Sequence, residues 1–99
     1  MTDPDREMIR EAVRTVLGDN VRVARARARL SQEKVASGMR ERGFDTWSRV
    51  TVSEIERYNR PVTVEELVGL ASVFGTHVSD LMSGAKWVED TRRPADEGS

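Results

Sequence analysis

The sequence has 99 residues, which suffices for one small domain with a modest hydrophobic core. It contains no cysteine, and this excludes disulfides, thiolate metal sites and a cysteine nucleophile. No apolar run approaches the roughly 20 residues of a membrane span, and the acidic N-terminus is unlike a signal peptide. A cytoplasmic protein is therefore expected.

The net charge of −1 hides an uneven distribution of charge along the chain. Residues 21–60 carry ten Lys and Arg against five Asp and Glu, whereas residues 1–20 and 61–99 are both net acidic. A basic segment attracts polyanions, so the middle of the chain is where a nucleic acid would bind. An ordinary charged and solvated surface remains the alternative at this point.

The first predicted element is an N-terminal helix, which begins near Pro4, a favoured first helical residue, and runs to about Leu17. Gly18 and Asp19 are expected to break this helix. A second helix is then expected from Asp19 to about Ala28.

Residues 21–30 alternate apolar residues with arginine, as a half-buried strand would. The alternation changes parity between Val23 and Ala24, however, which would turn a strand over to its other face. Helical spacing instead gives one continuous apolar stripe, through Val13, Leu17, Val21, Ala24 and Ala28. A helix is therefore predicted.

Four further helices are indicated by residues that can accept hydrogen bonds from free N–H groups at a helix start. These caps are Ser31, Ser48, Thr63 with Glu66 as a capping box, and His77. The helices that follow them are expected over residues 32–42, 49–57, 64–74 and 78–82. Phe44 and Trp47 lie in the connection before the helix at 49–57, where Trp47 is expected to anchor the core rather than to stack on a base.

No strand of substance is expected, so the predicted fold class is all-α. Residues 1–17 would form an N-terminal helical extension, and residues 18–83 would form one compact five-helix domain. Residues 84–99 lack apolar periodicity and are expected to form a partly disordered tail.

Two segments, LSQEKVA at residues 30–36 and TVSEIERYNRPVTVEELVGLASVFGTHVSDLM at 51–82, resemble the lambda/434 repressor and Cro-type (XRE-like) helix-turn-helix domains. The resemblance covers about residues 18–83. It rests on five sequence features that occur in the same order along the chain as in the family. They are Ser31-Gln32, Ala36, Ile55-Glu56, Pro61, and Gly75 to Leu81. It implies a repressor-type helix-turn-helix fold.

The sequence departs from the family pattern in its connection between the two motif helices and at two glycine positions. The connection around GMRERGFDTW is several residues longer than usual, as in sequences that look like an actinobacterial branch of the family. Arg29 and Tyr58 stand where the family commonly has glycine. These departures concern loop geometry and not the fold.

The resemblance also implies which residues read DNA bases. The recognition helix would begin after its N-cap Ser48 and place its first turn in the major groove. The base-contacting residues would be Arg49, Val50, Thr51 and Glu54. Arginine donates two hydrogen bonds to guanine, valine and threonine touch the thymine methyl, and glutamate accepts from cytosine N4. Packing of Val50 against Trp47 or Phe44 remains an alternative.

Contacts to the phosphate backbone would come from the start of the preceding helix and from residues flanking the recognition helix. They are expected from Ser31, Gln32, Ser48, Arg57, Asn59 and Arg60, with Arg40 and Arg42 as additions. Ordinary exposed charge is the alternative for the two additions. In the family, the arginine seven residues before the Gln pairs with the glutamate of the I-E pair. This implies a structural salt bridge between Arg25 and Glu56.

Nothing in the sequence indicates catalysis or a cofactor. His77 is the single histidine and stands at a helix cap. No metal cluster, glycine-rich phosphate loop or nucleophile constellation is present in the sequence. A non-enzyme is therefore expected.

The resemblance implies sequence-specific binding to double-stranded DNA by a transcriptional regulator, in particular a repressor, acting as a homodimer on an inverted repeat. The preferred dimer surface is the last helix with Val78, Met82 and Trp87. The other is the N-terminal helix with Met8, Ile9, Val13 and Val16. A protein-interaction module on the same fold, such as an antitoxin or a phage-encoded antagonist, is the alternative function.

Overall fold

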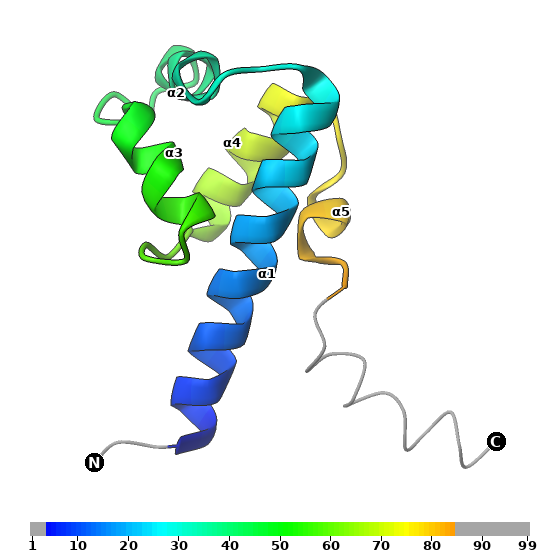
Figure 1. Ribbon diagram of the computed structural model, residues 1–99. Helices are drawn as coiled ribbons and strands as arrows, with labels where there is room; N and C mark the ends of the chain where they lie inside the picture. Colours follow the sequence, from blue (N-terminus) through cyan, green and yellow to red (C-terminus); the bar gives the residue numbers. More distant parts are fainter. Residues whose placement is uncertain (1–3, 85–99) are drawn as a thin grey trace, which may run out of the picture.

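A computed structural model describes residues 4–84, and within that range it contains five helices and no strand. They are α1 (Pro4–Ala28), α2 (Gln32–Glu41), α3 (Arg49–Glu56), α4 (Val64–Phe74) and α5 (Val78–Met82). The C-terminal half of α1 packs against α3, α4 and α5, and α2 packs against α3 and α4 (Figure 1). The all-α prediction is confirmed. The predicted tail lies outside the described residues apart from Gly84.

The helix starts predicted from the caps Ser31, Ser48, Thr63 and His77 are confirmed. Capping depends on residues within one helical turn, so it could be predicted from the sequence. The Ser31 side chain accepts a hydrogen bond from the Lys34 backbone N–H at 3.0 Å, at the start of α2. At the start of α4, Thr63 and Glu66 form a reciprocal capping box with N–H to side-chain distances of 2.9 and 3.1 Å. His77 lies at the N-cap of α5, where its backbone N–H donates to Asp80.

The predicted break at Gly18 and Asp19 is wrong, because α1 is one continuous helix of 25 residues. Gly18 is buried, and a Cβ atom at that position would lie 2.6 Å from the carbonyl oxygen of Ile55 and 2.7 Å from Cδ1 of Tyr58. The glycine therefore permits a close approach between α1 and the end of α3. It does not end the helix, whose backbone hydrogen bonds continue through it.

The hydrophobic core lies between the C-terminal half of α1 and the other four helices. Its buried apolar residues are Leu17, Val21, Val35, Ala36, Met39, Trp47, Val52, Ile55, Leu70, Ala71 and Leu81. Trp47 is thus a core anchor, as predicted. Burial of these side chains supplies most of the stabilisation that a domain of this size has available.

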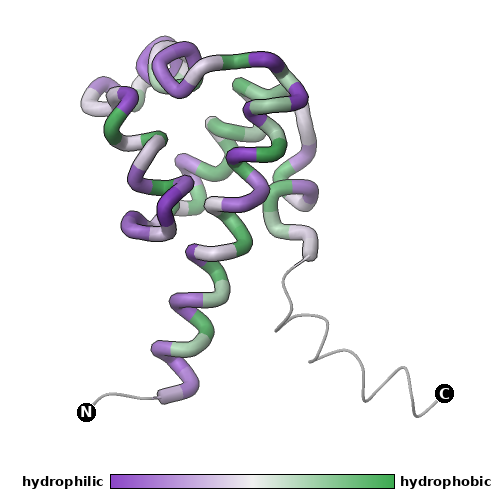
Figure 2. The backbone as a smooth tube through the Cα atoms, in the orientation of Figure 1, coloured by the Kyte–Doolittle hydropathy of each residue, from purple (hydrophilic) through white to green (hydrophobic). Residues whose placement is uncertain are grey.

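The N-terminal part of α1 projects away from this core (Figure 1). Residues 4–11 are all exposed, although apolar segments occur along this part of the helix (Figure 2). Met8 is 63% exposed and Ile9 is 47% exposed. No helix within residues 4–84 is long and apolar enough to cross a membrane.

Within residues 4–84, two residues other than glycine adopt the left-handed backbone conformation: Arg29 with φ of 58° and Tyr58 with φ of 68°. Both stand where glycine is common in the family that the sequence resembles. The loops therefore keep the backbone geometry that glycine would provide, at a cost of about 1–2 kcal/mol per residue with a Cβ atom. At Tyr58 the side chain offsets this cost, because its ring lies against Gly18 and its hydroxyl donates to Asp19.

We expect Arg29→Gly to raise the free energy of unfolding by up to about 1 kcal/mol. It removes left-handed strain at an exposed position, and the greater entropy of glycine in the unfolded chain reduces the gain. Urea unfolding followed by circular dichroism measures the change. Arg27→Gly, within α1, is the control and should lower stability by about 0.5–1 kcal/mol. A loss of stability in both variants would contradict the prediction.

Candidate nucleic-acid interface

Helices α2 and α3 lie in direct contact and share part of the core. Val35 and Met39 of α2 and Val52 and Ile55 of α3 are all at most 1% exposed. The side of α3 that carries Val52 and Ile55 therefore faces the protein interior. The opposite side is available to a ligand.

The connection over residues 42–48 is longer than the three or four residues typical of this motif, yet it is held firmly. The backbone N–H of Phe44 donates to Met39, and that of Trp47 donates to Phe44, both at 3.1 Å. The two aromatic rings meet edge to face with centroids 6.3 Å apart. Arg40 donates to the Trp47 carbonyl at 2.7 Å. These contacts fix the entry of the chain into α3.

The start of α3 presents Arg49 and Val50 to solvent. Val50 is 57% exposed, so the alternative in which it packs against Trp47 or Phe44 is wrong. Arg49 is exposed, and its side chain forms no hydrogen bond or ion pair within residues 4–84. Its guanidinium group is therefore free to bind a ligand.

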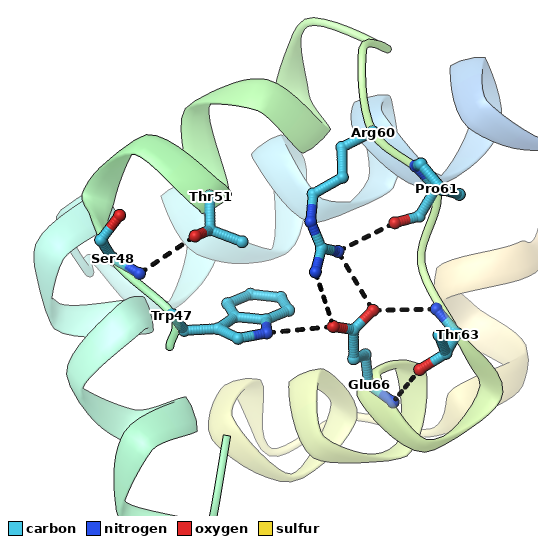
Figure 3. Close-up of polar contacts among 7 residues, drawn as sticks. All are labelled: Trp47, Ser48, Thr51, Arg60, Pro61, Thr63 and Glu66. Carbon is cyan, nitrogen blue, oxygen red and sulfur yellow. Dashed lines mark hydrogen bonds and ion pairs between the residues drawn. The ribbon is translucent and has the colours of Figure 1, made fainter. Parts of the chain in front are cut away.

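Thr51 and Glu54, the other two predicted base-contacting residues, are half-buried. The Thr51 hydroxyl accepts a hydrogen bond from the backbone N–H of Ser48 at 3.1 Å (Figure 3). This contact orients the side chain, and its methyl group is the part that can touch a thymine methyl. Glu54 lies four residues after Val50 on the outward side of the helix.

Sequence reasoning missed Ser53, which is half-buried on the same helix. It follows Arg49 by four residues and Val50 by three, so it shares their side of α3. That spacing was the available signal. Its hydroxyl is able both to donate to and to accept from a base edge or a phosphate.

The end of α3 is held by Glu56, which is 5% exposed. Arg25 of α1 donates to its carboxylate at 2.7 and 3.0 Å, and Gln32 of α2 donates to it at 3.2 Å. The structure thus brings Arg25 and Glu56 together as the resemblance implied. The hydrogen bond to Glu56 raises the pKa of Arg25 above its ordinary value, although burial opposes this. Arg22 adds a 2.6 Å hydrogen bond to the Glu56 carbonyl.

Three of the arginines predicted to contact phosphates are engaged within the protein. Arg40 pairs with Glu33 at 2.7 Å, and Arg42 donates to the Ser72 hydroxyl and to the Gly38 carbonyl at 2.9 Å. Arg60 pairs with Glu66 of α4. These contacts give the three residues a structural role, and binding of phosphate by any of them would compete with it.

The other residues predicted to contact phosphates form none of these ion pairs, and most of them are exposed. Arg57 and Asn59 are exposed just after α3, and no side-chain hydrogen bond of either occurs within residues 4–84. Ser31 and Ser48 are exposed at the starts of α2 and α3, and Ser31 uses its hydroxyl as a cap. Gln32 is half-buried, with its amide N–H directed to Glu56.

A buried polar cluster joins the connection before α3 to the start of α4 (Figure 3). Trp47 Nε1 donates to Glu66 at 3.1 Å, and Arg60 donates to both carboxylate oxygens at 2.8 and 3.1 Å. The Arg60 guanidinium also lies 5.3 Å from the centroid of the Trp47 ring. Burial alone would raise the pKa of Glu66, but hydrogen bonds from Arg60, Thr63 and Trp47 outweigh it and lower the pKa to about 2.

Residues 4–84 contain no group of acidic, His or Cys side chains that could hold a metal ion. A family model described as a helix-turn-helix domain matches residues 16–93. No curated protein and no solved structure matches the chain closely enough to count as a relative.

Proposed function

Because the chain belongs to this helix-turn-helix domain family, we propose that it binds double-stranded DNA in a sequence-specific manner and represses transcription. The recognition helix is α3, whose N-terminal turn enters the major groove. The proposal includes membership of the lambda/434 repressor and Cro-type branch, which the motifs of the sequence resemble. It acts in the cytoplasm, at the nucleoid.

The observation that carries this proposal is the exposure of Arg49 and Val50 at the start of a helix held at both ends. The polar cluster of Trp47, Arg60 and Glu66 fixes the N-terminal end of α3, and the contacts of Glu56 fix its C-terminal end. Arg49 is free to donate two hydrogen bonds to guanine O6 and N7, and Val50 to touch a thymine methyl group. A rigid helix makes such contacts selective because it cannot adjust to a wrong base.

Other exposed groups around α3 complete the interface. Glu54 and the methyl group of Thr51 lie beside Val50 as further base contacts. Arg57 and Asn59 follow the helix and contact phosphates, as do the backbone N–H groups at the start of α2. Such phosphate contacts set affinity and its dependence on salt, and do not select the sequence.

The first test is selection of bound duplexes from a random library at about 150 mM salt, where screening leaves specific contacts visible. We expect one inverted repeat to be enriched, with half-sites about one helical turn apart. Folded protein that enriches no sequence would contradict the proposal. It would favour a protein-interaction module on the same fold.

On the selected site, we expect Arg49→Ala to weaken binding by about 5- to 150-fold and to relax preference at one base pair. The loss corresponds to the roughly 1–3 kcal/mol of one bidentate contact. Titration of labelled duplexes with the matching and altered base pair measures both effects. Arg27→Ala, an exposed arginine of α1, is the control and should leave both unchanged. Equal weakening on every sequence would instead assign Arg49 to a phosphate.

A further inference from the structure

The N-terminal part of α1 carries an apolar stripe that is exposed at its N-terminal end, where Met8 and Ile9 are 63% and 47% exposed, and half-buried further along, where Val13 packs against the core. The stripe consists of Met8, Ile9, Ala12, Val13 and Val16, which recur at helical spacing on one side of the helix. A shallow groove runs along Met8, Ala12 and Val16.

We propose that this stripe pairs, in parallel, with the same segment of a second copy of the chain. The charges of the segment favour a copy of itself over a strongly charged partner, because residues 4–16 contain three arginines and three acidic residues. Arg6 and Arg10 lie on one edge of the stripe and Glu11 lies on the other. In a parallel pair, the basic edge of one helix lies on the same side as the acidic edge of its partner.

The parallel direction also rests on the proposed function. Helices α2 and α3 lie at the end of the molecule opposite the N-terminus of α1 (Figure 1). Parallel pairing of the N-terminal segments therefore leaves both α3 helices at one end of the dimer, where they can reach two half-sites of one duplex. Antiparallel pairing would send the two α3 helices to opposite ends.

The alternative dimer surface on α5 offers less apolar area. Met82 is half-buried and packs against the core, and Val78 is 37% exposed. Trp87 lies outside the described residues. The contrast with Met8 and Ile9, which are 63% and 47% exposed, favours α1 as the dimer surface.

The contact is small, because a few helical turns on each side bury less than the roughly 1,200 Å² of a standard interface. We therefore expect a weak dimer in free solution, which binding to two half-sites of one duplex strengthens. Sedimentation equilibrium of the full chain without DNA, over a range of protein concentrations, measures the dissociation constant of this dimer. A chain that stays monomeric at millimolar concentration would overturn the proposal.

Ile9→Glu and Val23→Glu form a matched pair of variants, because both residues lie on α1 and are 47% and 46% exposed. A charge within the stripe should raise the dimer dissociation constant at least tenfold, whereas Val23→Glu should leave it unchanged. Circular dichroism verifies that both variants are folded. An equal effect of the two changes, or none, would overturn the assignment of the stripe.

The chain has no cysteine, so single cysteines report the direction of pairing. Ile9→Cys and Val16→Cys lie about 10 Å apart along the helix. In a parallel pair each residue faces its own copy, so both variants should form disulfide-linked dimers on mild oxidation, and Val23→Cys should not. Linkage of one variant alone indicates an antiparallel pair and overturns the parallel proposal.

If neither variant is linked and the chain is monomeric, the stripe does not face a second copy of the chain. That result would overturn pairing through the stripe. None of these measurements uses DNA. Their failure would leave the proposed recognition by α3 standing, and a failure of DNA selection would leave the dimer measurement valid.

Discussion

Replacing Glu66 with alanine is expected to lower the free energy of unfolding by about 3 kcal/mol, because the carboxylate is the shared acceptor of a buried cluster. Glu66 is 7% exposed and accepts from Trp47, Arg60 and the Thr63 backbone. Its loss would leave the buried Trp47 indole N–H without its acceptor and would remove the ion pair of Arg60, which would keep its hydrogen bond to the Pro61 carbonyl. Urea unfolding followed by tryptophan fluorescence measures the change.

Glu65→Ala is the matched control, because Glu65 is the exposed neighbour on the same first turn of α4. It should cost at most about 1 kcal/mol, from the weakened interaction of an acid with the helix dipole. Equal losses from the two substitutions would show that the cluster contributes nothing beyond that dipole interaction.

The same cluster predicts a dependence of stability on pH. The pKa of Glu66 is about 2 in the folded protein, below its ordinary value of 4.5. The carboxylate therefore contributes fully above about pH 4.5, and its contribution is lost as the pH falls toward 2. The difference corresponds to about 3 kcal/mol. Glu66→Gln should remove this part of the acid dependence, which urea unfolding between pH 2 and pH 7 would show.

Features of the fold that depend on neighbouring residues could be predicted from the sequence. Helices begin at Ser31 and Thr63 because these side chains satisfy N–H groups within the next turn. The apolar stripe at 3.6-residue spacing likewise places Leu17 and Val21 in the core. Gly18 could not be predicted, because its role depends on residues of α3 that only the folded chain brings against it.

In the candidate site, too, only some features could be predicted from the sequence. Exposure of Val50 follows from helical spacing, because Val50 lies two residues before the buried Val52 and hence on the opposite side of α3. The partners of Arg60 could not be read from the sequence, because nothing in it shows which carboxylate lies beside a given arginine. Pairing of Arg25 with Glu56 was expected only through the family resemblance, since 31 residues separate them.

Gly18→Ala is expected to lower the free energy of unfolding by up to about 3 kcal/mol, although glycine to alanine within a helix ordinarily raises stability by about 0.5–1 kcal/mol. The new Cβ atom would lie 2.6 Å from the Ile55 carbonyl oxygen, which belongs to the backbone of α3. A tyrosine ring can rotate away from such a contact, but a helical carbonyl cannot. The substitution therefore forces α3 away from α1, and urea unfolding measures its cost.

Gly38→Ala in α2 is the control, because its Cβ atom would meet side chains and no backbone atom: the methyl groups of Val73 at 3.0 and 3.2 Å and Nη1 of Arg42 at 3.7 Å. We expect a change within about 1 kcal/mol there, since that side chain is able to shift. Gly18→Ala should remain destabilising in a Tyr58→Ala background, where the ring is gone and the carbonyl stays. If Tyr58→Ala abolishes the effect, the ring and not the α3 backbone limits the approach of the two helices. α3 would then keep its position against α1 when Gly18 is replaced.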